Sequence, residues 1–205
     1  MPYLFYEDWN DNKYSRDTAA IIALGGKLNN AGGRLIPKTT WVLGSGTATI
    51  TNGVNRLAPA ATLRSARAFP FNPNKTLVWE YKGRSTYSGR DHALRVTVLG
   101  ATRNNRWTAF GPNWQEAGNL NALWKCVNGS WTIVKLVAHS GNTNWHTISG
   151  KRYPDGTWEI FYDGVSDGTV ADSWLPSGNN YIWVSNDAGT YIHDVEFDNF
   201  KIWQE

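Results

Sequence analysis

The stretch NWHTISGKRYPDGTWEIFYDG at residues 144–164, together with VEFDNFKIW at residues 195–203, decides the fold prediction. In both stretches apolar residues alternate with polar ones, which is typical of a β-strand with one buried face. Asp155-Gly156 and Asp163-Gly164 are strong signals for tight hairpin turns. These stretches therefore predict short antiparallel strands, one of which turns its apolar face to the core through Trp158, Ile160 and Tyr162.

Short alternating runs continue through most of the chain, separated by turns that contain glycine, proline or asparagine. One such run places Leu94, Val96 and Val98 on the same face of a strand. Many short strands with turns of this kind indicate an all-β protein. Residues 18–28 differ, because they show a helical periodicity that Gly25-Gly26 ends, and they predict a short helix or an irregular apolar loop.

The order of these motifs resembles the C-terminal half of the concanavalin A-like (laminin G-like) jelly roll. In that family a W-H-x-I/V strand leads to a strand ending in Asp-Gly, and the last strand reads F-D-N-x-x-I/V-W. The sequence matches at Trp145–Ile148, at Asp163-Gly164 and at Phe197–Trp203. The resemblance is clearest over residues 144–203 and weaker over residues 3–12. It implies an antiparallel jelly-roll β-sandwich of two packed sheets, and the length suits one domain over residues 1–205.

Charge and cysteine content narrow the classes of function. The net charge is only +3 and Cys126 is the one cysteine, so an internal disulfide is excluded. A nucleic-acid-binding domain should be more basic and carry a clustered patch, so no nucleic-acid partner is predicted. The arginines between Arg84 and Arg106 are either solvated strand edges and loops or part of a groove for an acidic glycan.

The sequence also gives expectations about location. It contains no run of about 18 apolar residues, so no membrane span is predicted. Residues 1–8 lack the basic region followed by an apolar region that marks a signal peptide. We expect an extracellular protein whose signal has been removed, or a protein on the surface of a virion.

Twelve tryptophans are far above ordinary usage. Indole rings stack on the apolar faces of sugars, but tryptophan is also a large core residue. Apolar strand neighbours favour core positions for Trp41, Trp79, Trp145, Trp158 and Trp203. The Asn-rich segment 103–131 instead alternates aromatic with amide and guanidinium side chains, which suits a sugar site, although it also suits an ordinary loop and rim. The predicted ligand-binding residues are Trp107, Trp114, Trp124, Tyr87, Arg90, His92, Arg95 and Glu116.

A polysaccharide-degrading enzyme would show a recognisable pattern of catalytic residues. A glycosidase needs two carboxylates about 5–5.5 Å apart for retention or about 6.5–9.5 Å apart for inversion. The Glu-x-Asp-x-x-Glu strand of the retaining glucanases is absent, as are the Arg-x-Glu-x-Arg and Gln-Ile-His strands of alginate lyases.

We therefore predict a non-catalytic polysaccharide-binding domain, secreted or displayed on a particle, that requires no cofactor. Two alternatives stay open. One is a glycoside hydrolase or lyase with an unrecognised carboxylate pair among Glu80, Asp91, Glu116 and Glu159. The other is a virion or surface structural protein that self-associates or binds a virion partner.

The resemblance also implies one structural calcium ion near the junction of the first and last strands. Calcium prefers oxygen ligands, which makes Glu7, Asp8 and Asp198 the candidates. The alternative is that Asp198-Asn199 caps the sheet through bonds from side chain to backbone.

Overall fold

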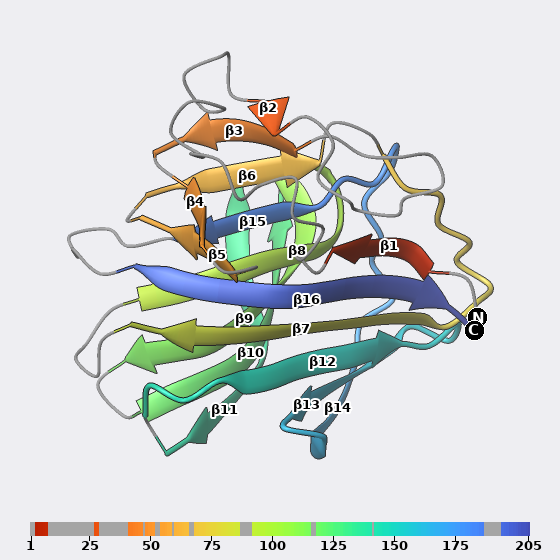
Figure 1. The fold of residues 1–205 in the computed structure, drawn as a ribbon. Helices are drawn as coiled ribbons and strands as arrows, with labels where there is room; N and C mark the ends of the chain where they lie inside the picture. Colours follow the sequence, from red (N-terminus) through yellow and green to blue (C-terminus); the bar gives the residue numbers. More distant parts are fainter. Residues whose placement is uncertain are drawn as a thin grey trace.

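The computed structural model describes residues 3–7, 27–28, 41–46, 48–51, 54–58, 60–65, 68–86, 92–115, 118–140, 142–186 and 194–205. Over these residues the regular secondary structure consists of β-strands (Figure 1). The helix or loop predicted for residues 18–28 lies outside the described residues, except that Lys27–Leu28 form a short strand. No helix in the described part of the chain is long and apolar enough to cross a membrane.

The first sheet, sheet A, contains eight strands. Seven of them follow the order β14 (Val165–Ala171), β13 (Thr157–Tyr162), β12 (His146–Arg152), β7 (Leu77–Ser85), β16 (Val195–Gln204), β5 (Val54–Leu57) and β4 (Ala48–Thr51). The eighth strand, β1 (Tyr3–Glu7), pairs with β16. The first and last strands are therefore neighbours, as the sequence analysis predicted.

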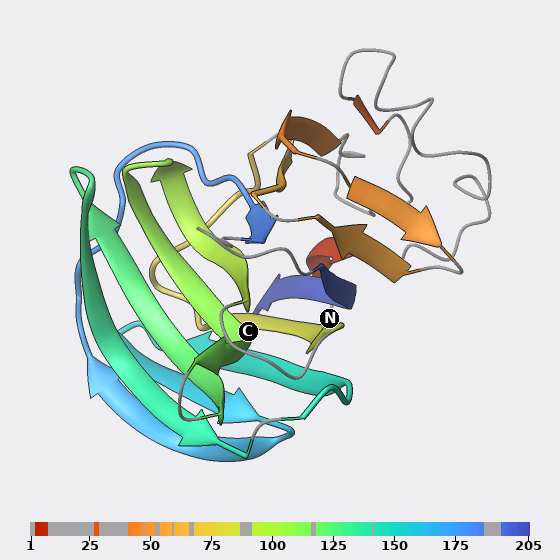
Figure 2. The ribbon, with the colours of Figure 1, turned by 90° about the vertical axis from the view of Figure 1, so that its left-hand side faces the viewer.

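The second sheet, sheet B, also contains eight strands. Their order is β11 (Ser130–His139), β10 (Gly118–Val127), β9 (Asn105–Gln115), β8 (His92–Thr102), β15 (Trp183–Asn186), β6 (Thr62–Ser65), β3 (Trp41–Ser45) and β2 (Lys27–Leu28). All pairings in both sheets are antiparallel. Figure 2 shows the green strands of sheet B curving over the teal and blue strands β12–β14 of sheet A. The predicted antiparallel β-sandwich is confirmed.

The hydrophobic core lies between the two sheets. It includes the alternating residues of β8 and β13 that the sequence predicted, together with Trp79 and Trp158, both fully buried. Gly150 lies opposite Trp79 in the pairing of β12 with β7, and a Cβ at this position would overlap the indole ring. Core positions are thus confirmed for Trp79 and Trp158, whereas Trp145 and Trp203 are half-buried.

Tight turns connect neighbouring strands where the sequence carries Asp-Gly or Asn-Gly. Asp163 and Gly164 join β13 to β14 with φ angles of 50° and 80°. Asn128 and Gly129 join β10 to β11 with φ angles of 50° and 86°. Positive φ at both central residues is the geometry of the tight hairpin turn that matches strand twist. The predicted hairpin at Asp163-Gly164 is confirmed.

Candidate ligand-binding face on sheet B

The outer face of sheet B, meaning the face turned away from sheet A, carries a second group of aromatic side chains. Trp107 and Ala109 of β9 belong to the core between the sheets. Phe110, the next residue, forms a separate cluster with Ala122 and Trp124 of β10. Because successive side chains of a strand point to opposite faces, this second cluster lies on the outer face.

Three rings build the aromatic part of this face. Phe110 and Trp124 lie with their ring centroids 4.8 Å apart, and Trp131 of β11 lies 6.3 Å from each of them. Trp131 is 37% exposed, so part of its indole ring is open to solvent. The face therefore offers an accessible aromatic surface that neighbouring rings hold in place.

Two arginines stack against these rings. The guanidinium of Arg95 lies 4.7 Å from the centroid of Phe110 and 5.9 Å from that of Trp131. The guanidinium of Arg106 lies 5.0 Å from Trp131 and 5.9 Å from Trp183 of β15. Stacking occupies the flat face of a guanidinium, and its N–H groups lie at the edge and can still donate hydrogen bonds.

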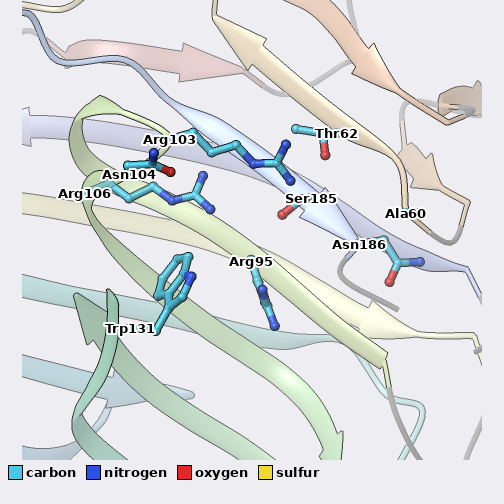
Figure 3. Close-up of a pocket in the computed structure, with 9 residues that line it drawn as sticks. All are labelled: Ala60, Thr62, Arg95, Arg103, Asn104, Arg106, Trp131, Ser185 and Asn186. Carbon is cyan, nitrogen blue, oxygen red and sulfur yellow. The ribbon is translucent and has the colours of Figure 1, made fainter. Parts of the chain in front are cut away.

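A pocket of about 430 Å³ opens beside this cluster (Figure 3). It is lined by Ala60, Thr62, Arg95, Arg103, Asn104, Arg106, Trp131, Ser185 and Asn186. These nine described lining residues include three arginines and no carboxylate. Figure 3 shows Arg103 and Arg106 extending in the same direction, from the turn between β8 and β9 and the start of β9. The remaining polar side chains among these nine are mostly hydroxyls and amides, so the described lining presents positive charge and neutral hydrogen-bonding groups.

Burial shifts the acid–base equilibria of two of these arginines. Burial, assisted by the charge of Arg106, lowers the pKa of Arg95 to about 10. Burial also lowers the pKa of Arg106 to about 10, with Cys126 opposing the shift and Arg103 adding to it. Both pKa values remain well above 7, so both side chains are cationic at neutral pH. The pocket thus holds partly desolvated, mutually repelling positive charges.

Arg106 is the most deeply placed of the three. The residue is 8% exposed, and its buried Nε atom has no hydrogen-bond partner in the described part of the chain. Among the described residues no carboxylate forms an ion pair with it. Leaving a buried charged donor without an acceptor is costly, so the Arg106 side chain is a candidate partner for a ligand in the pocket that it lines.

Gly100 allows Arg106 to reach this position. A Cβ added at Gly100 would lie 2.6 Å from the Cβ of Arg106 and 3.2 Å from Cζ3 of Trp183. Gly100 of β8 and Arg106 of β9 are also paired across the two strands. The lack of a side chain at Gly100 therefore lets Arg106 and Trp183 approach the strand backbone.

The structure corrects one predicted site residue. Trp107 is fully buried, and its ring centroid lies 4.2 Å from that of Trp158. Its Nε1 atom donates a hydrogen bond of 3.0 Å to the carbonyl oxygen of Trp174. The prediction that Trp107 stacks on a sugar is wrong, because its position in β9 turns it to the core.

The structure places only some of the other predicted ligand-binding residues. Trp124 and Arg95 do lie together on the outer face of sheet B, in contact with the same Phe110 ring. The backbone of β8 and β9 pairs His92 with Trp114. The remaining three, Tyr87, Arg90 and Glu116, lie outside the described residues. Arg103, Arg106, Phe110 and Trp131 were not among the named residues, although all four belong to the segment 103–131 that suited a sugar site. The pocket residues of β6 and β15 were not predicted.

The predicted calcium ligands are described only in part. Asp8 lies outside the described residues, and Glu7 is described in its backbone, where it pairs with Phe200. Asp198 Oδ1 accepts a hydrogen bond of 2.7 Å from the backbone N–H of Asn199, and Oδ2 accepts one of 3.0 Å from the Asn199 side chain. No group of three acidic, histidine or cysteine side chains suited to a metal occurs in the described part of the chain. These bonds fit the capping alternative, and calcium binding stays a prediction.

Comparison with known proteins identifies similar folds. No family model and no curated protein matches the sequence. The binding domain of botulinum neurotoxin DC, solved in complex with rat synaptotagmin II, is similar with a TM-score of 0.61 and 10% identity, covering 81% of this chain and 43% of that chain. The same domain in complex with SialylT gives a TM-score of 0.57 and 10% identity, with coverage of 81% and 42%.

A third similar structure belongs to botulinum neurotoxin type C, which depends on interaction with two ganglioside molecules to enter cells. It gives a TM-score of 0.58 and 11% identity, covering 81% of this chain and 43% of that chain. The chain therefore spans less than half of the length of each of these solved structures. At this level of identity the likeness shows a shared β-sandwich fold.

Proposed function

We propose that this chain is a non-catalytic carbohydrate-binding domain whose ligand lies on the outer face of sheet B. The observation that carries the proposal is the combination of the half-open Trp131 ring, the stacked guanidiniums of Arg95 and Arg106, and the polar pocket beside them. A sugar presents an apolar face to an aromatic ring and hydroxyls to planar hydrogen-bond donors. Both kinds of surface occur here side by side.

The similar folds add support of a general kind. The neurotoxin domains share the sandwich, and the structures include one complex with SialylT and one toxin that interacts with gangliosides. A β-sandwich can therefore form part of a protein that binds sugars. A polysaccharide ligand would also suit the expected location outside the cell or on the surface of a particle.

The described carboxylates favour binding over cleavage. Of the four that the sequence offered as catalytic candidates, Glu80 accepts a hydrogen bond of 2.9 Å from Lys201. Glu159 accepts hydrogen bonds from Tyr153 and Ser166. Both residues belong to sheet A, away from the arginine-lined pocket, and Asp91 and Glu116 lie outside the described residues. A binding role needs no acid–base pair in the pocket.

A structural role in an assembly is the second candidate. Strand β11 stands at one end of the order of sheet B, and β14 stands at one end of sheet A. These strands expose Ile133, Leu136 and Val165, which are 51%, 42% and 69% exposed. Exposed apolar edge strands can pair with another copy of the chain. Light scattering coupled to size-exclusion chromatography tests this: self-association that Ile133→Lys abolishes would favour assembly.

A glycan array tests the principal proposal. The purified domain should bind a defined group of plant, algal or microbial polysaccharides and leave the remaining glycans unbound. The bound polysaccharide should stay intact on prolonged incubation, as judged by the release of reducing ends or unsaturated products. A blank array would remove the basis for carbohydrate binding, and release of products would favour the enzyme.

A further inference from the structure

We infer, on the basis of the proposed carbohydrate-binding function, that the arginine pocket binds an anionic group of an acidic saccharide, either a carboxylate or a sulfate. The pocket places Arg95, Arg103 and Arg106 around one cavity, and none of the nine lining residues that the structure describes is acidic. The charge of Arg106 lowers the pKa of Arg95, and the charge of Arg103 lowers the pKa of Arg106, so these cations repel one another. An anion between them would relieve that repulsion.

Arg106 supplies a second and independent reason. This residue is more than nine-tenths buried, yet its Nε atom has no hydrogen-bond partner among the residues that the structure describes. The side chain lines the pocket and is labelled there in Figure 3. A guanidinium edge matches the paired oxygens of a carboxylate or sulfate, with which it forms charge-assisted hydrogen bonds. An anionic group in the pocket would therefore balance the buried positive charge of this guanidinium.

The surroundings of the pocket hold this guanidinium in a defined orientation. Trp131 and Trp183 contact it at 5.0 Å and 5.9 Å from their ring centroids. A side chain already fixed by stacking loses less freedom when it binds a ligand. Burial lowers the pKa of Arg106 to about 10, which leaves it charged at neutral pH.

The neutral groups of the pocket suit the remainder of a sugar. Thr62, Ser185 and Asn104 contribute hydroxyl and amide groups to the same lining. The volume of about 430 Å³ lies within the range of about 300–1,000 Å³ that small-ligand sites occupy. One charged sugar unit could place its anion at the arginines and its hydroxyls against these groups, while Trp131 flanks the opening.

A single-stranded nucleic acid would also combine anions with aromatic stacking, and it is less well matched. Nucleic-acid grooves track a repeating phosphate backbone with an extended row of positive charge. Here the lining charges are concentrated in one pocket, and the whole chain has a net charge of only +3. An oligonucleotide is therefore included in the test as a competing ligand.

The test compares polysaccharides that differ only in charge. Biolayer interferometry would measure binding to polygalacturonate and its fully methyl-esterified form, to dextran sulfate and dextran, and to a single-stranded oligonucleotide. We expect at least one acidic polymer to bind about tenfold more tightly than its neutral counterpart, as the loss of one charge-assisted hydrogen bond would predict. Preference for polygalacturonate would identify the carboxylate, and preference for dextran sulfate would identify the sulfate.

Two variants that each lose one positive charge test whether the preference for acidic polysaccharides arises in the pocket. Arg103→Gln removes an exposed pocket cation, and Lys82→Gln removes an exposed cation from β7 of sheet A. Arg103→Gln should reduce the affinity for the acidic polysaccharide about tenfold at an unchanged melting temperature. Lys82→Gln should change that affinity less than about twofold. Equal loss in both variants would overturn the pocket assignment.

Two results separate this inference from the proposed function. Binding to neutral and acidic polymers with equal affinity would overturn the anion pocket and leave carbohydrate binding intact. Binding to none of the four polysaccharides would overturn the anion pocket, and the glycan array would still decide the proposed function. Tighter binding to the oligonucleotide that Arg103→Gln abolishes would overturn both.

Discussion

The guanidinium of Arg106 lies 5.0 Å from the centroid of the Trp131 ring, although the two residues belong to strands that β10 separates. This contact spans the central strand of the aromatic cluster and fixes the exposed indole beside the pocket. A cation over an indole face is worth about 0.5–1 kcal/mol at an exposed site. The ring is thereby held in a fixed position at the mouth of the pocket before any ligand arrives.

Replacing Trp131 should separate binding from stability. Trp131→Ala should weaken binding of the preferred polysaccharide about tenfold or more, because a central aromatic contact is typically worth about 2 kcal/mol or more. The free energy of unfolding should fall by only about 1–2 kcal/mol, since the ring is partly exposed.

Trp145 offers the matched control. It is also half-buried, and Arg84 stacks over it at the same distance of 5.0 Å, but it precedes β12 of sheet A. Trp145→Ala should lose a similar amount of stability and keep full affinity. If the two variants lose affinity equally, the ligand does not lie on the outer face of sheet B.

In contrast to Trp131, replacing Trp107 should mainly reduce stability. Because its ring is fully buried against Trp158, Trp107→Ala should lower the free energy of unfolding by about 3–5 kcal/mol. Chemical denaturation monitored by circular dichroism measures this loss. A fall below about 1 kcal/mol would show that the ring does not pack in the core against Trp158.

Gly100→Ala should disturb the pocket without removing any of its functional groups. The added Cβ would displace Arg106 and Trp183, so affinity for the acidic polysaccharide should fall. Gly150→Ala is the control, since its Cβ would overlap Trp79 in the core, away from the pocket. Both variants should lose stability through overpacking, by about 1–3 kcal/mol. Measured well below the melting temperature, only Gly100→Ala should lose affinity, and equal affinity in both would argue against the role of Arg106.

Glu196 should give part of the stability a dependence on pH. Burial alone would raise the pKa of this carboxyl, but hydrogen bonds from Arg84 and Arg56 outweigh it and hold the pKa below its ordinary value of 4.5. A depressed folded-state pKa contributes stability above the unfolded value, and that contribution is lost as the pH falls through the folded value.

Melting curves over a pH series test this contribution. The wild-type melting temperature should fall as the pH drops below 4.5, and Glu196→Gln should show a smaller fall together with lower stability at pH 7. Parallel curves for the two proteins would mean that the ion pairs with Arg56 and Arg84 contribute little.

Local patterns were enough to predict an all-β protein, and the family resemblance added the sandwich of two sheets. Alternation in Leu94–Val98 and Trp158–Tyr162 identified buried strand faces, and Asp163-Gly164 identified a hairpin. These signals work because a strand exposes alternate residues to one face and a two-residue turn demands positive φ. Both depend only on neighbouring residues, which the sequence shows directly.

The site was harder to predict because it depends on distant contacts and on which face a strand residue occupies. Trp107 and Phe110 lie in one strand, yet their side chains pack on opposite faces of sheet B. Register shifts between β8 and β9 further alter which side chains share a face. Thr62 and Ser185 join the pocket through pairing of strands that are far apart in the sequence, for which no local pattern exists.

The most direct test of the central claim is an NMR titration that follows the indole N–H signals of the twelve tryptophans. The titrant is a short oligosaccharide of the polysaccharide that binds most tightly, and single Trp→Phe variants assign the signals. We predict that the signals of Trp131, Trp124 and Trp183 shift, while those of Trp79 and Trp158 in the core and Trp145 beyond it do not. Shifts confined to Trp145, Trp203 or other tryptophans away from this face would contradict the account.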